Sequence, residues 1–328
     1  MSALGNLANL VNDLAKTDSM QDIAESIADL NHLTLKDLDL ITQLGRGAYG
    51  DVFKVKVLET GEELAMKVIS MLEADATHKS RTLLEVRTLH ASACPHLVSF
   101  RGAFVDGDDL HILLELMWGS LEDLSELVRG VMGDDYLVPE FVVQHVAHAV
   151  TTAMRYLKKE FKVMHRDLKP ANILVNSAGM AKLCDLGLSK VLTDSITKTQ
   201  VGSKAYMSPE RLTEPSYDVR ADVWSLGLVL VELVTGEYPY AYLDQPLRIL
   251  TAIAEGVVPD MPDSLPYSDE CKDFIKTCLQ PDPANRPKPK ALIKHSFLKS
   301  KSSDSAAFAD WMADLTRQYE EIHGESFN

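Results

Sequence analysis

The chain has 328 residues, 46% of them hydrophobic, which suffices for the core of one two-lobed domain or of two domains. Lysine and arginine total 33 and aspartate and glutamate 48, and the net charge of −15 argues against nucleic acid and anionic membrane surfaces as partners. The four cysteines lack metal-ligand or C-x-x-C spacing, and neither a secretory signal nor an apolar run long enough for membrane insertion is visible, so we expect a cytoplasmic protein that could also enter the nucleus.

An acidic extension, residues 1–37, precedes the first strand pattern. Its apolar residues recur every three or four positions, as at Ile23, Ile27 and Leu30, and Asp18-Ser19 offers an N-cap, so we predict helix over residues 1–33. Periodicity reports only an apolar face, and it is equally compatible with packing on the domain and with a regulatory role.

A glycine-rich segment follows at residues 45–50, with the spacing G-x-G-x-x-G. It lies between two strand patterns rather than between a strand and a helix, which disfavours a dinucleotide-binding turn. The second strand continues to Val57, and the chain turns at Thr60-Gly61 and returns as Glu63–Ile69. Glycines let backbone amides approach phosphate oxygens, so this pattern predicts a hairpin over phosphates, with Lys67 positioned to contact them.

A helix is predicted over residues 77–90, with Leu83 and Val86 on its apolar face. Glu85 lies beside that face and is the preferred ion-pair partner of Lys67. Glu63 and Glu73 remain alternatives. Two further strands, over residues 97–104 and 110–115, are joined by the turn signal Asp106-Gly107.

The second half of the chain is predicted to be helical with short loops. A helix over residues 142–157 leads to His165-Arg166-Asp167-Leu168-Lys169-Pro170-Ala171-Asn172. Two short strands, 173–175 and 181–184, then form a hairpin that returns Asp185 to Asn172. An apolar helix follows over residues 222–233.

With these motifs in place, residues 38–298 resemble a eukaryotic protein kinase domain. The resemblance implies an α+β, bilobal fold. A small antiparallel sheet with one main helix forms the N-lobe, residues 38–116, and a larger helical C-lobe spans residues 117–298. It also implies ATP and Mg²⁺ as cofactors.

The resemblance assigns a role to each motif residue. Asp167 accepts the proton of the substrate hydroxyl, with Lys169 as the second catalytic-loop residue, and Asn172 and Asp185 hold magnesium. Lys67 and Glu85 form the ion pair required for activity. A structural ion pair joins Glu210 of Ser-Pro-Glu to Arg286. ATP contacts fall on Leu44, Gly45, Arg46, Gly47, Ala48, Tyr49, Gly50, Val52, Ala65, Lys67, Leu114, Glu115, Met117 and Leu174.

A narrower resemblance is to the mitogen-activated protein kinase kinase family. It rests on the glycine-rich segment, on Glu115-Leu116-Met117 followed by Ser120-Leu121, and on Tyr206–Leu212. It also rests on Ser195 and Thr199, which match the paired phosphorylation sites of that family. The resemblance implies activation by an upstream MAP kinase kinase kinase, and transfer of phosphate to Thr and Tyr of a T-x-Y motif in a downstream MAP kinase.

Residues 299–328 predict an amphipathic helix that places Phe308, Trp311 and Leu315 on one face. Such a face suits docking on its own lobe or binding of the upstream kinase. Three features depart from the family pattern, and one of them is that no proline-rich insert follows Pro239. Leu186 replaces the usual phenylalanine after Asp185, and the N-terminal extension lacks a basic docking peptide.

Two other functions compete with the dual-specificity kinase. A nucleotide-binding pseudokinase scaffold is disfavoured, because a pseudokinase normally lacks at least one of five motif residues. All five are present in this chain: Lys67, Glu85, Asp167, Asn172 and Asp185. A Ser/Thr kinase elsewhere in the cascade stays open, since Lys169 is typical of Ser/Thr kinases and tyrosine activity rests on the resemblance alone.

Overall fold

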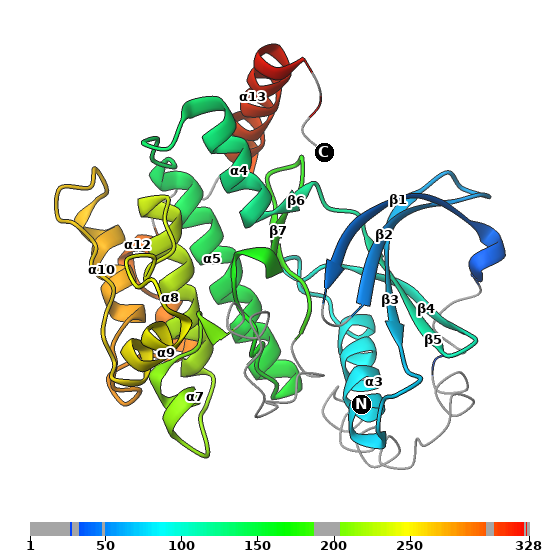
Figure 1. Cartoon of the computed structure of the whole chain (residues 1–328), viewed down its shortest axis with the longest axis horizontal. Coiled ribbons are helices and arrows are strands. Elements are labelled where there is room, and N and C mark those ends of the chain that lie inside the picture. The colour runs from blue at the N-terminus through cyan, green and yellow to red at the C-terminus, as the bar shows by residue number, and fades with distance from the viewer. Residues whose placement is uncertain are drawn as a thin grey trace. The chain divides into compact units, whose positions relative to one another are not determined.

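The computed structural model describes residues 27, 33–47, 50–186, 204–299, 305–324 and 326 (Figure 1). The chain divides into two compact units, the first running to Met117 and also taking in Leu186. The second holds Trp118–Asp185 and the described residues from position 204 onward. The first unit is a β-sheet with one main helix and the second is mostly helical, which confirms the predicted α+β bilobal class. None of the helices in the described ranges combines the length and apolarity needed to cross a membrane.

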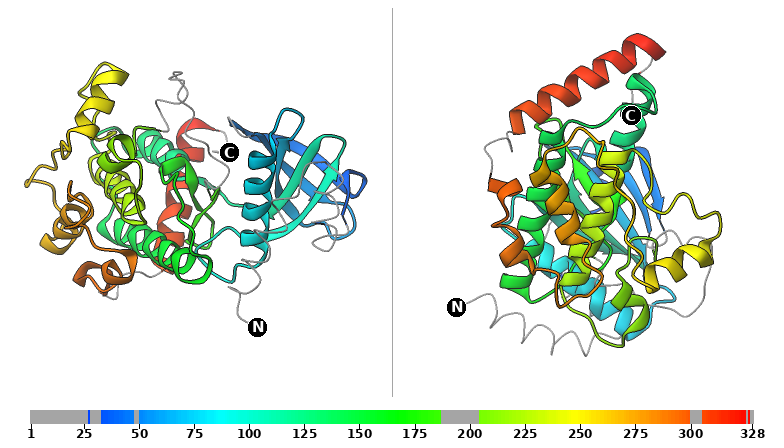
Figure 2. Two further views of the ribbon diagram at one scale, coloured as in Figure 1. Left: turned by 90° about the horizontal axis from the view of Figure 1, so that it is seen from below. Right: turned by 90° about the vertical axis from the view of Figure 1, so that its left-hand side faces the viewer.

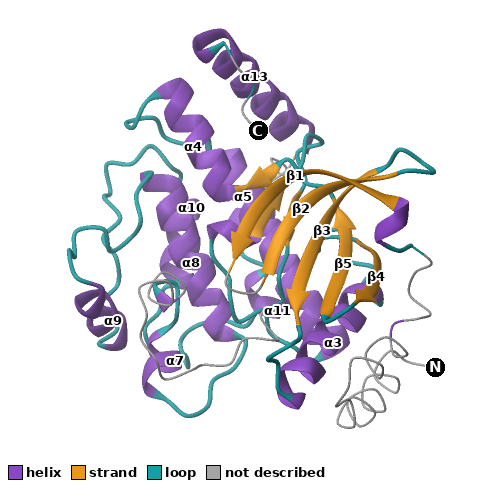
Figure 3. Cartoon of the chain, turned by 45° about the vertical axis from the view of Figure 1, so that its right-hand side comes forward, coloured by secondary structure: helices purple, strands orange, loops and turns teal. Residues whose placement is uncertain are grey.

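The first unit is built on a five-stranded antiparallel sheet with strand order β1-β2-β3-β5-β4 (Figure 3). A short 3₁₀ turn, Leu35–Asp37, leads into it. The strands are β1 (Leu38–Gly47), β2 (Gly50–Val57), β3 (Glu63–Ser70), β4 (Phe100–Asp106) and β5 (Asp109–Glu115). The predicted 97–104 strand begins later, at Phe100, because residues 94–97 form a turn closed by the Leu97 N–H on the Cys94 carbonyl at 3.2 Å.

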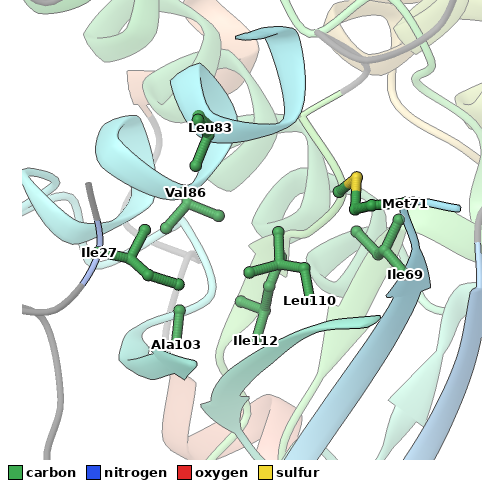
Figure 4. Close-up of a cluster of buried hydrophobic side chains, with 8 residues drawn as sticks. All are labelled: Ile27, Ile69, Met71, Leu83, Val86, Ala103, Leu110 and Ile112. Carbon is green, nitrogen blue, oxygen red and sulfur yellow. The ribbon is translucent and has the colours of Figure 1, made fainter. Parts of the chain in front are cut away.

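Helix α3 (Ala76–His90) covers one face of this sheet. It starts at Asp75, whose carboxylate accepts the His78 N–H at 2.7 Å and so satisfies one of the unpaired donors of the first turn. The helix buries Leu83 and Val86 against sheet residues. Ile27 joins this cluster and is 1% exposed (Figure 4). This residue of the N-terminal extension therefore packs on the domain, while most of the predicted 1–33 helix lies outside the described residues.

In the second unit, α5 (Glu140–Tyr156) packs against α8 (Arg220–Thr235). Helix α8 is buried almost all round, as its unbroken apolar pattern predicts. A three-stranded sheet lies beside the helices in the order β6-β7-β8. The elements are β6 (Gly119–Ser120), α4 (Leu121–Met132), α5 (Glu140–Tyr156) with a π turn at Leu157–Phe161, β7 (Ile173–Val175), β8 (Ala181–Leu183), α7 (Pro209–Thr213), α8 (Arg220–Thr235), α9 (Pro246–Ala254), α10 (Asp269–Cys278), α11 (Pro289–Leu292), α12 (Ser296–Lys299) and α13 (Ser305–His323).

The C-terminal helix α13 packs on its own unit, beside α4 and α5 (Figure 1). Phe308 is 0% and Leu315 1% exposed, whereas Trp311 is half-buried. The predicted apolar face is therefore used within the chain. Phe308 and Leu315 are not available on the surface as anchors for an upstream kinase.

Candidate active site

The loop of residues 165–172 is held by the start of α8. The two carboxylate oxygens of Asp222 accept the backbone N–H groups of His165, at 2.8 Å, and of Arg166, at 2.9 Å. The His165 ring bonds the carbonyl oxygen of Cys184 at 2.8 Å. These bonds hold Arg166 at a φ of 68°, a conformation that costs a non-glycine residue free energy and that persists where surrounding contacts enforce it.

Asp167 and Asn172 are hydrogen-bonded to each other within this loop. The amide nitrogen of Asn172 donates to the Asp167 carboxylate at 2.6 Å and to the Asp167 carbonyl at 2.6 Å. Lys169 Nζ lies 3.9 Å from the same carboxylate. Asp167 and Asn172 are both 6% exposed, so the carboxylate is an oriented hydrogen-bond acceptor with a cation nearby.

The predicted hairpin brings Asn172 and Asp185 to the same end of two short strands. Ile173 of β7 pairs with Leu183 of β8, and the Cys184 N–H donates to the Asn172 carbonyl at 3.1 Å. Asp185 follows at once, with a φ of 49°. Because the Asn172 amide nitrogen is directed at Asp167, its amide oxygen is the atom that can face a metal. One carboxylate and one amide oxygen fit Mg²⁺, which binds nucleotide sites through few protein ligands together with phosphates and water.

The sheet of the first unit groups four of the predicted ATP contacts. Val52 pairs with Lys67 in the β2–β3 register, and Ala65 pairs with Leu114 in the β3–β5 register. Opposed residues, and residues two apart on a strand, point to the same face, so these four side chains share one face. Gly45 lies opposite Val52 on β1.

Lys67 and Glu85 are both buried, at 8% and 5% exposure. Helix α3, which carries Glu85, packs on the sheet face that Lys67 shares, because Ile112 opposite Lys67 belongs to the α3 cluster. The two alternatives to Glu85 differ from it. Glu63 is paired with Lys54 at 2.8 Å, and Glu73 is exposed.

The segment after β5 is held by one side chain. The Glu115 carboxylate accepts the Ser99 N–H at 2.7 Å while its own N–H donates to the Ser99 carbonyl at 2.9 Å. Met117 is 9% exposed at the end of the first unit. In the second unit, Leu174 lies on β7 opposite Ser120 and is half-buried.

Glu210 and Arg286 form a buried bidentate ion pair, with nitrogen–oxygen distances of 2.7 and 3.2 Å. Arg286 also donates to the carbonyl oxygens of Gln280, Pro281 and Arg220. Its guanidinium lies 5.1 Å from the centre of a Trp224 ring. A buried charge with this many partners stabilises one arrangement of the surrounding chain.

Tyr206 and Glu232, both half-buried, form a second polar pair that the sequence patterns did not indicate. The Tyr206 hydroxyl donates to Glu232 at 2.5 Å, and the Ser225 hydroxyl donates to the Tyr206 carbonyl at 2.7 Å. Burial raises the pKa of Glu232, although the bond from Tyr206 opposes this. Burial and the Glu232 carboxylate raise the pKa of Tyr206 well above its usual range. The supporting role of Asp222 was likewise not predicted. Neither Asp222 nor Glu232 belongs to a local motif that marks it as a site residue.

Several predicted positions lie outside the described residues: Ala48, Tyr49, Ser195 and Thr199. Leu44 is 49% exposed, and Arg46 pairs with Asp51 at 3.2 Å on the surface. Leu186, the departure from the usual phenylalanine, is 0% exposed, so its apolar side chain is buried.

Comparison with known proteins places the chain in a family. Residues 38–298 match the family model described as protein kinase domain. Dual specificity mitogen-activated protein kinase kinase 7 of Homo sapiens is 36% identical over 293 residues, covering 87% of this chain and 68% of that protein. Protein kinase wis1 of Schizosaccharomyces pombe is 36% identical over 289 residues, covering 85% of this chain and 46% of that protein. The chain belongs to the protein kinase family and is an ATP-dependent protein kinase of the MAP kinase kinase type.

Proposed function

We propose that this kinase transfers the γ-phosphate of ATP to the Thr and the Tyr of a T-x-Y motif in a downstream MAP kinase. The observation that carries the proposal is the Asp167 carboxylate, oriented by Asn172 at 2.6 Å with Lys169 at 3.9 Å. A base held in this way can accept a proton from a Thr or a Tyr hydroxyl. The relatives named as dual specificity kinases support transfer to both.

The other site residues bind and orient the reactants. Asn172 and Asp185 would hold magnesium, which when bound neutralises charge on the phosphates. Lys67 would contact the α- and β-phosphates, and Glu85 would hold Lys67 in position. Glu115 and Met117 would offer backbone groups to the adenine. The remaining ATP contacts are proposed at Leu44, Gly45, Arg46, Gly47, Ala48, Tyr49, Gly50, Val52, Ala65, Leu114 and Leu174.

Phosphorylation of Ser195 and Thr199 by an upstream MAP kinase kinase kinase is the proposed activating step. Arg166 is the nearest candidate partner for a phosphate in sequence, beside the catalytic Asp167. Its buried guanidinium Nε has no hydrogen-bond partner among the described residues. A phosphate adds about −1.5 to −2 charge and strong acceptors, which such a donor can bind. We also propose a cytoplasmic location, where an upstream and a downstream kinase would both be met.

The test is incubation of the protein, activated and unactivated, with MgATP and a panel of inactive MAP kinases, followed by mass spectrometry. Phosphate on both Thr and Tyr of one T-x-Y motif is the expected result. Phosphate on Ser or Thr alone would favour the competing Ser/Thr function, for which Lys169 is the specific observation. No transfer after activation would favour a pseudokinase.

A further inference from the structure

The tip of the β7–β8 hairpin packs against the first turn of α13. Asn176 shapes the tip, because its side-chain oxygen accepts the N–H groups of Ala178 at 3.1 Å and of Met180 at 2.9 Å. Gly179 follows with a φ of 70°. A Cβ on Gly179 would overlap the Ser305 carbonyl oxygen and would lie 2.7 Å from the backbone nitrogen of Ala309. The hairpin tip therefore meets the helix backbone directly.

Helix α13 is fixed to the second unit along its length (Figure 2). Near its start, the Phe308 ring packs edge-on against His145 of α5, with ring centres 5.3 Å apart. Near its end, His323 Nε2 lies 3.3 Å from the Gly130 carbonyl of α4. A Cβ on Gly130 would lie 3.0 Å from the Tyr319 ring. The absence of a side chain at Gly130 therefore leaves room for α13 to pack closely on α4. Helix α13 therefore contacts α5 near its start, α4 near its end, and the hairpin tip at Ser305 and Ala309.

The open end of the same hairpin holds Asn172 and Asp185. Asn176, the first residue of the tip, is four residues from Asn172, so the tip is roughly 13 Å from the metal-binding end of the hairpin. Strand β8, which leads to Asp185, is one of the two edge strands of its sheet and pairs with β7 alone. Short hairpins are marginally stable by themselves. Strand β8 also packs on α5, and the His165 ring holds the Cys184 carbonyl, so the contact at Gly179 is a further restraint that acts on the tip of the hairpin.

We propose that α13 positions the metal-binding residues: by resting on Gly179 it fixes the hairpin that sets Asn172 relative to Asp185. Gly179 is a positioning residue, since it touches neither reactant. The inference rests on the proposed function only in requiring that Asn172 and Asp185 hold magnesium. It makes α13 a second determinant of nucleotide binding, beyond any docking role of its exposed face.

The first experiment compares two glycines in the full-length protein. ADP binding is measured by calorimetry with Mg²⁺ and with a chelator, and hydrogen exchange is followed over residues 173–183. For Gly179→Ala we expect affinity for ADP with Mg²⁺ to fall about tenfold, unchanged affinity in chelator, and faster exchange in the hairpin. Gly107→Ala is the matched control. Its φ of 59° is also left-handed, but a Cβ there meets nothing within 4 Å. It should keep the wild-type affinity for ADP with Mg²⁺.

A second pair of variants loosens α13 away from the hairpin and covers the case in which Gly179→Ala does not fold. Leu315 and Leu292 are 1% and 2% exposed, and truncation of either to alanine should lower the melting temperature. Only Leu315→Ala, on α13, should weaken ADP binding with Mg²⁺, by about threefold, while Leu292→Ala on α11 leaves it unchanged.

The outcomes separate the two proposals. If wild-type ADP binding ignored Mg²⁺, or if Asn172→Ala kept the Mg²⁺ dependence, the metal role and this inference would both fall. If that dependence held but Gly179→Ala and Leu315→Ala bound ADP as the wild type does, α13 would be a stabilising helix only. An equal loss in Leu292→Ala would lead to the same conclusion, because general loosening of the unit would explain it.

Discussion

Arg286 and Arg166 lie in the same unit and differ in how completely their guanidinium groups are paired. Arg286 donates five hydrogen bonds, to Glu210 and to three carbonyl oxygens, and its side chain is 0% exposed. Arg166 has a left-handed backbone and a buried Nε donor that no described residue accepts. A fully paired charge stabilises the fold, whereas a strained residue with a spare donor is suited to an incoming phosphate.

The largest expected effect is on catalysis, at Asp167. Asp167→Asn should lower turnover by about 10²–10⁴-fold, because the positioned base is lost. The free energy of unfolding should change little, since asparagine keeps the shape and can still accept a bond from Asn172. Turnover and ADP affinity are measured together. Near-normal turnover would remove Asp167 from its assigned role.

Substitution of the fully paired Arg286 should mainly lower the stability of the fold, whereas substitution of Asp167 mainly lowers turnover. Arg286→Met leaves Glu210 buried without its partner and should lower the free energy of unfolding by about 3–5 kcal/mol, read from urea unfolding. The double variant Glu210→Leu/Arg286→Met removes both charges and should recover part of that loss. A single variant as stable as the wild type would show that the pair contributes nothing to stability.

The next largest effect is expected at the proposed activation sites, Ser195 and Thr199. Ser195→Ala/Thr199→Ala should fold but lose activation by the upstream kinase, a difference of about 10- to 100-fold, if each phosphate makes charge-assisted bonds of about 1.5–3 kcal/mol. Double glutamate should raise basal activity partially, because a carboxylate carries less charge than a phosphate. Activity is measured before and after treatment with the upstream kinase. Full activation of the double-alanine protein would rule out this switch.

The smallest expected effect concerns pH and the half-buried Glu232. Burial raises its pKa above the ordinary value of 4.5, so the folded state holds its proton more tightly than the unfolded state does. That contribution to stability is complete below pH 4.5 and is lost as pH rises through the folded pKa. Glu232→Gln, which still accepts from Tyr206, should therefore gain stability relative to the wild type as pH rises, on the order of 1 kcal/mol.

The control for Glu232→Gln is Glu214→Gln, at an exposed position of the same unit. Unfolding free energies of the three proteins are compared between pH 4 and pH 7, as an approximate working range for a carboxyl group. Parallel curves for Glu232→Gln and the wild type would show that burial at Glu232 does not couple to folding.

Local motifs predicted the site better than they predicted its supports. The catalytic loop and the hairpin to Asp185 are contiguous in sequence, so the alternation of apolar and polar residues and the turn residues were enough to predict their positions. The supporting contacts join distant positions. Asp222 is 57 residues from His165 in the sequence. Gly179 contacts α13, which begins more than a hundred residues later, and hydrophobic periodicity cannot predict a contact between such distant segments. Amphipathic spacing in the C-terminal helix correctly indicated an apolar face, but spacing cannot tell whether the chain itself covers that face.

Dual specificity through a single base is the central claim, and substrates with one hydroxyl test it most directly. Two forms of an inactive MAP kinase are prepared, one with Val in place of the T-x-Y threonine and one with Phe in place of the tyrosine. Single-turnover transfer is measured with the activated wild type and with Asp167→Asn. We predict transfer to both forms by the wild type, and a parallel loss on both in the variant. Transfer to threonine alone, or a loss confined to one form, would contradict the account.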